Sequence, residues 1–302
     1  MRPLELGLAL TALEDIPSGG ANSWRTLSLM ARRVEELGFD TLWLADELLW
    51  KVEKWPGTRG FWESASLVGA LAATTSRISL GSWVFSALHR NPALTVRIAE
   101  TLDEITGGRF VFGFGAGHDG NSSFGYATDN TVTRYVEALA IVMPLLREGH
   151  ASFAGRYHRV DDLENRPRGP RPGRIPLMLG GNGPRTIALA ARHADIWSAL
   201  ATGDSRPEAF AERIRLAEQS CTDIGRDPAS LRKSASVWVR ASSSLDASEQ
   251  IFGEMLPGDP ARLAEAAHQF GELGFTSLEL ALIPERPDSL EYVGRVVEVL
   301  DG

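Results

Sequence analysis

Residues 107–126 read GGRFVFGFGAGHDGNSSFGY and combine a short apolar run with regularly spaced glycines. The run 109–114 is rich in aromatic residues, which is typical of a buried parallel strand. Glycines at 113, 115, 117 and 120 allow a backbone to approach a bulky ligand. The polar residues His118, Asp119 and Asn121 follow at once, in a place where α/β proteins often carry their chemistry. A glycine-rich turn without any ligand is the alternative interpretation.

Strands and helices alternate through the rest of the chain. Seven further strands are expected at 4–10, 39–45, 77–85, 175–179, 194–199, 231–240 and 275–283, and helices at 24–37, 61–75, 92–105, 131–147, 184–193, 208–223, 259–273 and 289–300. Eight such units in 302 residues predict an α/β fold, a (β/α)8 TIM barrel in one domain, 1–302, with loop insertions. A doubly wound open sheet is the rival.

Three segments stand outside this alternation. Residues 48–60 are expected to form a loop, and 151–160 a short strand or hairpin. Residues 241–258 fit no element, and we interpret them as a lid or insertion over the site.

Composition narrows the classes of function. The chain is 43% hydrophobic and 23% charged, which is normal for a globular protein, and its net charge of −8 argues against nucleic acid or an acidic membrane as partner. With Cys221 as the only cysteine, a disulfide and a multi-cysteine metal site are excluded. The first residues do not lead us to expect a signal peptide, and the sequence contains no run of about 18 apolar residues. We therefore expect a cytoplasmic protein without a membrane span.

Polar and glycine residues recur where the predicted strands end. The ends carry Asp46 and Glu47, the segment 82–84, residues 118–121 and the glycines of 180–183. In a barrel these ends meet on one face and ring one pocket. Adjacent residues in extended backbone point to opposite sides, so only one of Asp46 and Glu47 is expected to face it. His118 is a candidate general acid or base, and a solvated loop histidine is its alternative.

The stretch LMLGGNGPRT, 177–186, passes from a strand through glycines into a helix start. Backbone N–H groups at such a start bind phosphate, although a plain strand-to-helix junction has the same pattern. The sequence contains no G-x-S-x-G, H-E-x-x-H or Walker motif and no metal-ligand spacing of histidines. The pattern therefore favours a flat, phosphorylated cofactor, with Trp50 and Trp55 as an aromatic wall for the substrate.

Four segments together resemble the bacterial luciferase-like flavin- or F420-dependent oxidoreductases. They are FDTLWLADE (39–47), RISLGSWVFSALHRNPA (77–93), TLDEITGGRFVFGFGAG (101–117) and PLMLGGNGPRTIALAARHADIW (176–197). The resemblance runs from about residue 4 to residue 283. It implies a TIM barrel, often dimeric, that binds reduced FMN or the deazaflavin F420 at its C-terminal face. The run GGRFVFGFGAG followed by N-x-x-F-G favours the F420-type branch.

The same resemblance assigns site residues. It implies that the segment 82–84 is a bulge with a non-proline cis peptide behind the ring, either at Trp83–Val84 or at Ser82–Trp83. Glu47 stands where the branch commonly has a histidine, and His118 where some members have an acidic catalytic residue. The expected cofactor-binding residues are Asp46, Ser82, Trp83, Val84, Gly117, Asn121, Gly180, Gly181, Asn182 and Gly183.

We therefore expect F420-dependent hydride transfer to or from a small organic substrate, with Glu47 or His118 moving a proton. A monooxygenase that uses FMNH2 supplied by a separate reductase is the first alternative. A non-catalytic flavin-binding barrel is the second. A homodimer without a metal site is expected in each case.

Overall fold

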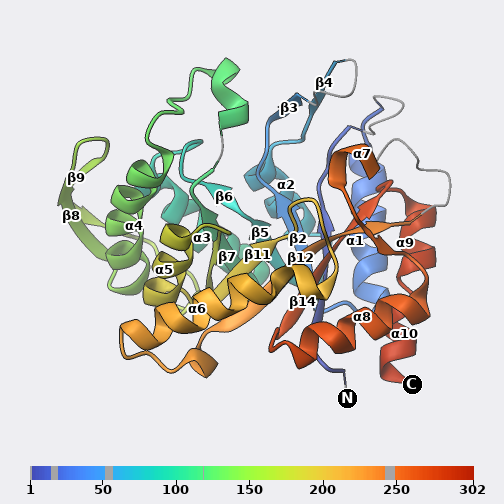
Figure 1. Cartoon of the computed structure of the whole chain (residues 1–302). Coiled ribbons are helices and arrows are strands. Elements are labelled where there is room, and N and C mark those ends of the chain that lie inside the picture. Colours follow the sequence, from blue (N-terminus) through green and yellow to red (C-terminus); the bar gives the residue numbers. More distant parts are fainter. Residues whose placement is uncertain (1, 15–19, 52–56, 118, 242–248) are drawn as a thin grey trace.

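Eight parallel strands form a closed barrel at the centre of the molecule (Figure 1). The computed structural model describes residues 2–14, 20–51, 57–117, 119–241 and 249–302. β14 pairs with β1, and β7 pairs with β10, so the ring has no open edge. The predicted TIM barrel is therefore confirmed, and the rival open sheet is wrong. In order around the ring the strands are β1 (Glu5–Leu10), β2 (Thr41–Ala45), β5 (Ser79–Trp83), β7 (Phe110–Gly115), β10 (Leu177–Gly180), β11 (Ile196–Leu200), β12 (Arg232–Arg240) and β14 (Ser277–Ile283).

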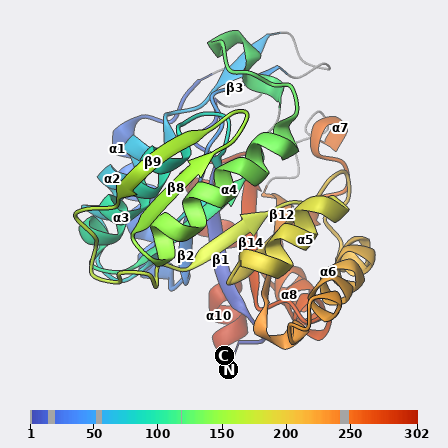
Figure 2. The same ribbon diagram turned by 90° about the vertical axis from the view of Figure 1, so that its left-hand side faces the viewer.

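Helices surround the barrel (Figures 1 and 2). The predicted ranges of α1, α4 and α5 are confirmed to the residue. For α1, Ser23 Oγ accepts a hydrogen bond from the Thr26 N–H, and Gly38 ends the helix with φ of 84°. The helices are α1 (Trp24–Leu37), α2 (Ser64–Ala72), α3 (Pro92–Thr106), α4 (Thr131–Arg147), α5 (Pro184–His193), α6 (Ala211–Asp223), α8 (Pro260–Glu272), α9 (Pro287–Val293) and α10 (Val296–Asp301).

Two segments depart from the expected pattern. Residues 48–60, expected as a loop, contain the antiparallel strands β3 (Leu49–Lys51) and β4 (Thr58–Gly60). Residues 289–300, expected as one helix, belong to α9 and α10, which are interrupted at Gly294. A Cβ at Gly294 would lie 2.6 Å from Leu37 Cδ1, so the break lets the chain pack closely against α1.

The other two uncertain segments also have regular structure. The strands β8 (His150–Ala154) and β9 (Arg159–Glu164) form a hairpin outside the barrel beside α4 (Figure 2). In 241–258, the structure describes α7 (Glu249–Phe252) and β13 (Leu256–Pro257), which pairs with β12. Residues 242–248 lie outside the described residues, and the lid interpretation stays a prediction.

The barrel interior is filled around one indole. Trp43 is buried among Ala9, Met178, Ile196 and Ala281. Its ring lies over two glycines, because a Cβ at Gly7 or Gly81 would come within 2.5 Å or 2.2 Å of it. None of the described helices has the length and apolar run needed to cross a bilayer.

Candidate functional site

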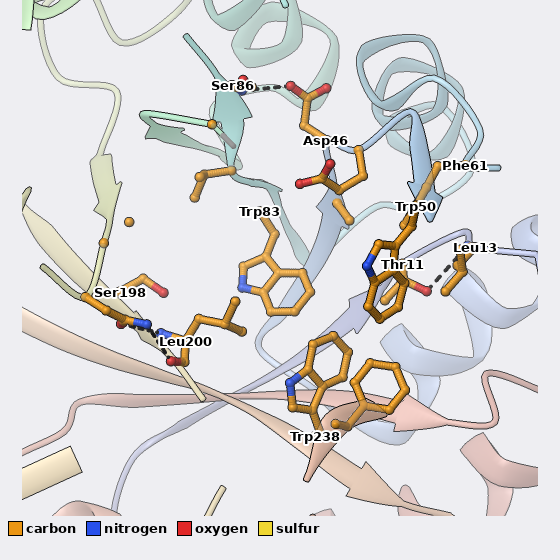
Figure 3. Close-up of a pocket in the computed structure, with 18 of the residues that line it drawn as sticks. Thr11, Leu13, Asp46, Trp50, Phe61, Trp83, Ser86, Ser198, Leu200 and Trp238 are labelled. Atoms are coloured by element: carbon orange, nitrogen blue, oxygen red, sulfur yellow. Dashed lines mark hydrogen bonds between the residues drawn. The ribbon is translucent and has the colours of Figure 1, made fainter. Parts of the chain in front are cut away.

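A cavity of about 430 Å³ opens at the C-terminal end of the barrel (Figure 3). Six barrel strands reach it with their last residues or the residues just after, as expected for a TIM barrel. Its lining is mostly apolar and aromatic, which suits a flat organic molecule. The lining residues are Thr11, Leu13, Ala45, Asp46, Glu47, Trp50, Phe61, Trp83, Val84, Ser86, Gly117, Gly180, Gly181, Asn182, Ser198, Leu200, Trp238, Phe252 and Ile283.

The bulge after β5 forms one side of the cavity. The Trp83–Val84 peptide bond is cis, at one of the two places that the resemblance implied. Both residues line the cavity, whereas Ser82 is fully buried beneath them. Ser82 Oγ donates to the Gly113 carbonyl over 2.8 Å and accepts from the Gly113 N–H over 2.9 Å. Ser82 therefore connects the bulge to β7 and does not contribute to the cavity lining.

The glycine run that we interpreted as space for a ligand mainly accommodates this bulge. A Cβ at Gly113 would lie 1.9 Å from the Ser82 carbonyl oxygen, and a Cβ at Gly115 would lie 2.5 Å from Val84 Cγ2. Among Gly113, Gly115 and Gly117, the glycines of this run whose surroundings the structure describes, only Gly117 lines the cavity. It has φ of 74°, and a Cβ there would lie 2.2 Å from Ser86 Oγ. Sequence alone did not distinguish a neighbouring strand from a ligand as the reason for these glycines.

Asp46 is a buried partner of the turn that follows the bulge. Its Oδ2 accepts from the Ser86 N–H over 2.8 Å (Figure 3), and it lies 3.2 Å from His89 Nδ1. Arg90 donates to both carboxylate oxygens, over 2.7 and 2.8 Å. Burial raises the pKa of Asp46, but the hydrogen bonds from His89 and Arg90 outweigh it, so the pKa lies below its usual value. Asp46 is therefore an ionised anchor at the edge of the cavity.

Glu47 also lines the cavity and is half-buried. Both residues touch the cavity, but the Asp46 side chain is 1% exposed and its carboxylate is bonded to Ser86 and Arg90. The expectation that only one of the two side chains faces the pocket stays a prediction. The sequence predicted Glu47 at the site, and in the structure Glu47 lines the cavity.

The glycine segment after β10 forms another side of the cavity. Gly180, Gly181 and Asn182 line it, whereas Gly183 lies outside the lining at the N-terminus of α5. Asn182 uses its side chain within the protein: Nδ2 donates to the Leu200 carbonyl over 2.9 Å, and Oδ1 accepts from the Leu200 N–H over 3.2 Å. In the described chain no side chain caps the first turn of α5. This turn therefore offers backbone donors beside the cavity.

Aromatic side chains form an aromatic wall of the cavity, and Figure 3 labels Trp50, Trp83 and Trp238 among them. The ring centroids of Trp238 and Phe252 are 4.3 Å apart, and those of Phe252 and Trp50 are 5.5 Å apart. Trp83 meets Trp238 edge-on at 6.1 Å. Trp50 was predicted here, whereas Trp238 and Phe252 were missed. Trp238 lies near the end of a predicted strand and was available to the same reading of strand ends, but Phe252 lies in the segment that fitted no element.

A buried carboxyl inside the barrel was also missed. Glu279 on β14 is 0% exposed and accepts hydrogen bonds from Trp83, Ser198, Ser234 and Ser236. Burial raises its pKa, although these hydrogen bonds act in the opposite direction. The alternating run SLELALI gives no local sign that this glutamate points inward.

Three predicted residues are not tested. His118 and Trp55 lie outside the described residues. Of Asn121 only the backbone is described, within the 3-10 turn Asp119–Phe124. His89 is buried and stacks on Tyr126. Within the described ranges, no three His, Cys, Asp or Glu side chains are grouped to hold a metal ion.

This chain belongs to the luciferase-like monooxygenase family, whose model matches residues 5–283. Members of the family are oxidoreductases and monooxygenases. The resemblance stated from the sequence is confirmed at this level.

Two curated relatives show the range of the family. The chain is 28% identical over 254 residues to a phthiodiolone/phenolphthiodiolone dimycocerosates ketoreductase of Mycobacterium sp. (strain JLS), covering 76% of this chain and 64% of that protein. It is 30% identical over 209 residues to the pyrimidine monooxygenase RutA of Caulobacter vibrioides (strain NA1000 / CB15N), covering 66% and 57%. The chain thus spans less than two thirds of the length of these relatives.

Solved structures share the fold over nearly the whole chain. An F420-dependent secondary alcohol dehydrogenase in complex with an F420-acetone adduct has a TM-score of 0.80 at 18% identity, covering 99% of both chains. The long-chain alkane monooxygenase LadA has a TM-score of 0.78 at 15% identity, covering 100% of this chain and 92% of that one. At these identities the likeness shows the barrel alone.

Proposed function

We propose that this protein is an F420-dependent oxidoreductase that interconverts a carbonyl and an alcohol on a small, largely apolar substrate. The observation that carries the proposal is a single cavity lined by the Trp83–Val84 bulge, by the glycine segment 180–182 and by a group of aromatic side chains. The ketoreductase relatives and the F420-dependent alcohol dehydrogenase of the same fold support the carbonyl–alcohol couple.

The described residues fit such a cofactor. A planar ring needs flat apolar surfaces, and Trp83 and Val84 supply one at the edge of the cavity. A phosphate needs backbone donors and close approach, which the first turn of α5 and the preceding glycines supply. A side chain at Gly181 would fill this place, since its Cβ would come within 2.4 Å of Thr186 Oγ1.

When bound, the deazaflavin supplies hydride transfer. The protein's own residues bind the ring, orient it and exchange protons with the bound molecules. Trp83 and Val84 hold the ring from one side, and Trp50, Trp238 and Phe252 exclude water from the substrate side. Glu47 exchanges a proton at the cavity wall. Asp46 acts indirectly, because its carboxylate is bonded to Arg90 and the turn at Ser86. The proposal includes a homodimer and a separate enzyme that regenerates the reduced cofactor.

A monooxygenase that uses reduced FMN is the second candidate. The relative of 30% identity, the pyrimidine monooxygenase RutA, favours it, and so does the fold shared with LadA. The same cavity and the first turn of α5 can hold either cofactor. The choice between F420 and FMN therefore depends on a direct measurement.

The decisive experiment is a parallel titration of the protein with F420 and with FMN, followed by tryptophan emission. We expect F420 to bind at least about tenfold more tightly, which is about 1.4 kcal/mol. Trp83→Phe should remove much of the quenching, whereas Trp24→Phe, a change on the exposed surface of α1, should not. Tighter FMN binding, with substrate-dependent O2 uptake, would select the monooxygenase, and binding of neither would overturn both.

A further inference from the structure

A hydrogen-bonded chain runs from the barrel interior to the cavity. It begins at Glu279, whose Oε2 accepts from Ser236 Oγ through a short contact. Ser236 Oγ lies 3.1 Å from Ser198 Oγ, and either atom can be the donor. Ser198 lines the cavity (Figure 3). Ser198 Oγ also donates directly to Glu279 Oε2 over 3.3 Å. One or two hydroxyls therefore connect a fully buried carboxyl to the place where substrate and cofactor would lie.

The surroundings of the carboxyl are polar but uncharged. The side chains that face it are Trp83 from β5, Ser198 from β11, and Ser234 and Ser236 from β12. β1 contributes Gly7, where a Cβ would lie 3.5 Å from Glu279 Cγ. No guanidinium or ammonium group is part of this set. Burial without a cation favours the neutral form of a carboxyl, and burial raises the pKa of Glu279 above its usual value.

We propose that Ser198 is a catalytic hydroxyl that exchanges a proton with the molecule in the cavity, and that Glu279 is its proton reservoir, either through Ser236 or by direct contact. The inference rests on the proposed function, which requires two proton transfers. One proton is transferred to the substrate oxygen, and one is released from the reduced ring. Glu47 provides one exchanging group in the wall. The chain of hydroxyls that ends at Ser198 provides the second proton-exchanging group, and we call this chain the relay.

The proton steps balance. In the reduction direction the Ser198 O–H bond breaks as the product O–H bond forms. On the route through Ser236, Ser198 Oγ takes the proton of Ser236, and Ser236 Oγ takes the proton of Glu279. By direct contact, Ser198 Oγ takes the proton of Glu279. The product oxygen loses its negative charge, and Glu279 becomes a carboxylate. The oxidation direction reverses each transfer.

The geometry also stabilises the charged state of the reservoir. Once Glu279 has lost its proton, Ser234 Oγ donates to Oε1 over 2.5 Å and Trp83 Nε1 donates to Oε2 over 3.1 Å. Ser236 then donates to Oε2 as well. Hydrogen bonds to the charged form offset the desolvation of a buried carboxylate. Trp83 thus joins the relay to the bulge that borders the cavity.

The test uses the protein without cofactor or substrate, so its failure is distinguishable from failure of the F420 titration. Infrared difference spectra between the parent and Glu279→Gln at neutral pH should show the C=O stretch of a protonated carboxyl in the parent. On transfer to D2O this band should shift as the proton exchanges through Ser198. Absence of the band in the parent would overturn the proposal.

Two serine variants then test the route. Ser198→Ala should slow the exchange by about 10²-fold or more, which is the scale on which a positioned proton-transfer group acts. Ser234→Ala is the matched control, because Ser234 bonds the same carboxyl but does not reach the cavity lining, and it should leave the exchange rate unchanged. Ser198→Thr, which retains a hydroxyl, should restore the rate. Equal exchange rates in Ser198→Ala and the parent would overturn the relay.

Discussion

Replacement of Arg90 by methionine tests the buried ion pair at the edge of the site. Methionine retains an apolar stem but removes the guanidinium that bonds both oxygens of Asp46. The side chains of Arg90 and Asp46 are 11% and 1% exposed, so the remaining carboxylate cannot be rehydrated in place. Removing one partner of such a pair costs about 3–5 kcal/mol. That is a large share of a folding free energy of about 5–15 kcal/mol.

The loss should depend on pH with a definite sign. In the parent the pKa of Asp46 is depressed below its ordinary 3.8, so its contribution to stability is present above pH 3.8 and is lost as pH falls through the lower, folded-state value. In Arg90→Met burial is no longer offset by Arg90, and the pKa of Asp46 rises. The destabilisation should therefore be largest at neutral pH and should shrink as the solution is acidified.

Urea unfolding, followed by tryptophan emission and circular dichroism, measures the effect. Glu63→Gln is the matched control, since Glu63 also bonds Arg90 over 2.6 Å but is 45% exposed and should cost less than about 1 kcal/mol. Asp46→Asn combined with Arg90→Met should recover part of the loss, because no unpaired charge remains. A loss below about 1 kcal/mol for Arg90→Met at neutral pH would refute the reasoning.

Three further changes follow from the structure. Gly117→Ala should destabilise the protein by about 1–3 kcal/mol and weaken cofactor binding, because the new Cβ would lie 2.2 Å from Ser86 Oγ. Gly125→Ala is the control, since Gly125 also has a positive φ, of 79°, but a Cβ there meets open space. Equal losses of unfolding free energy in urea would contradict the clash. Glu279→Gln should gain unfolding free energy relative to the parent as pH rises above 4.5, because the parent carboxyl ionises there only when unfolded; parallel pH profiles would argue against a raised pKa. Phe252→Ala should cost about 3 kcal/mol and shift tryptophan emission, and an unchanged spectrum would count against its packing on the pocket indoles.

The candidate site was predictable in part. Reading the ends of predicted strands located Asp46, Glu47, Trp83, Val84 and the segment 180–182, all of which line the cavity. This worked because a parallel barrel brings every strand end to one face, whatever the details of its packing. The same reading did not reveal that Asn182 bonds Leu200 or that Ser82 bonds Gly113, since those partners come from other strands.

The sequence by itself determined the eight βα units, the bounds of α1, α4 and α5 and the face that carries the site. Those features depend on spacing within one segment: apolar periodicity, caps and glycines at strand ends. Only the tertiary structure decided that Arg90 neutralises Asp46, that Gly113 and Gly115 make room for the bulge, and that Glu279 meets three serines inside the barrel. These pairings depend on the register between strands and on which residues the closed ring brings face to face, and no local pattern encodes that register.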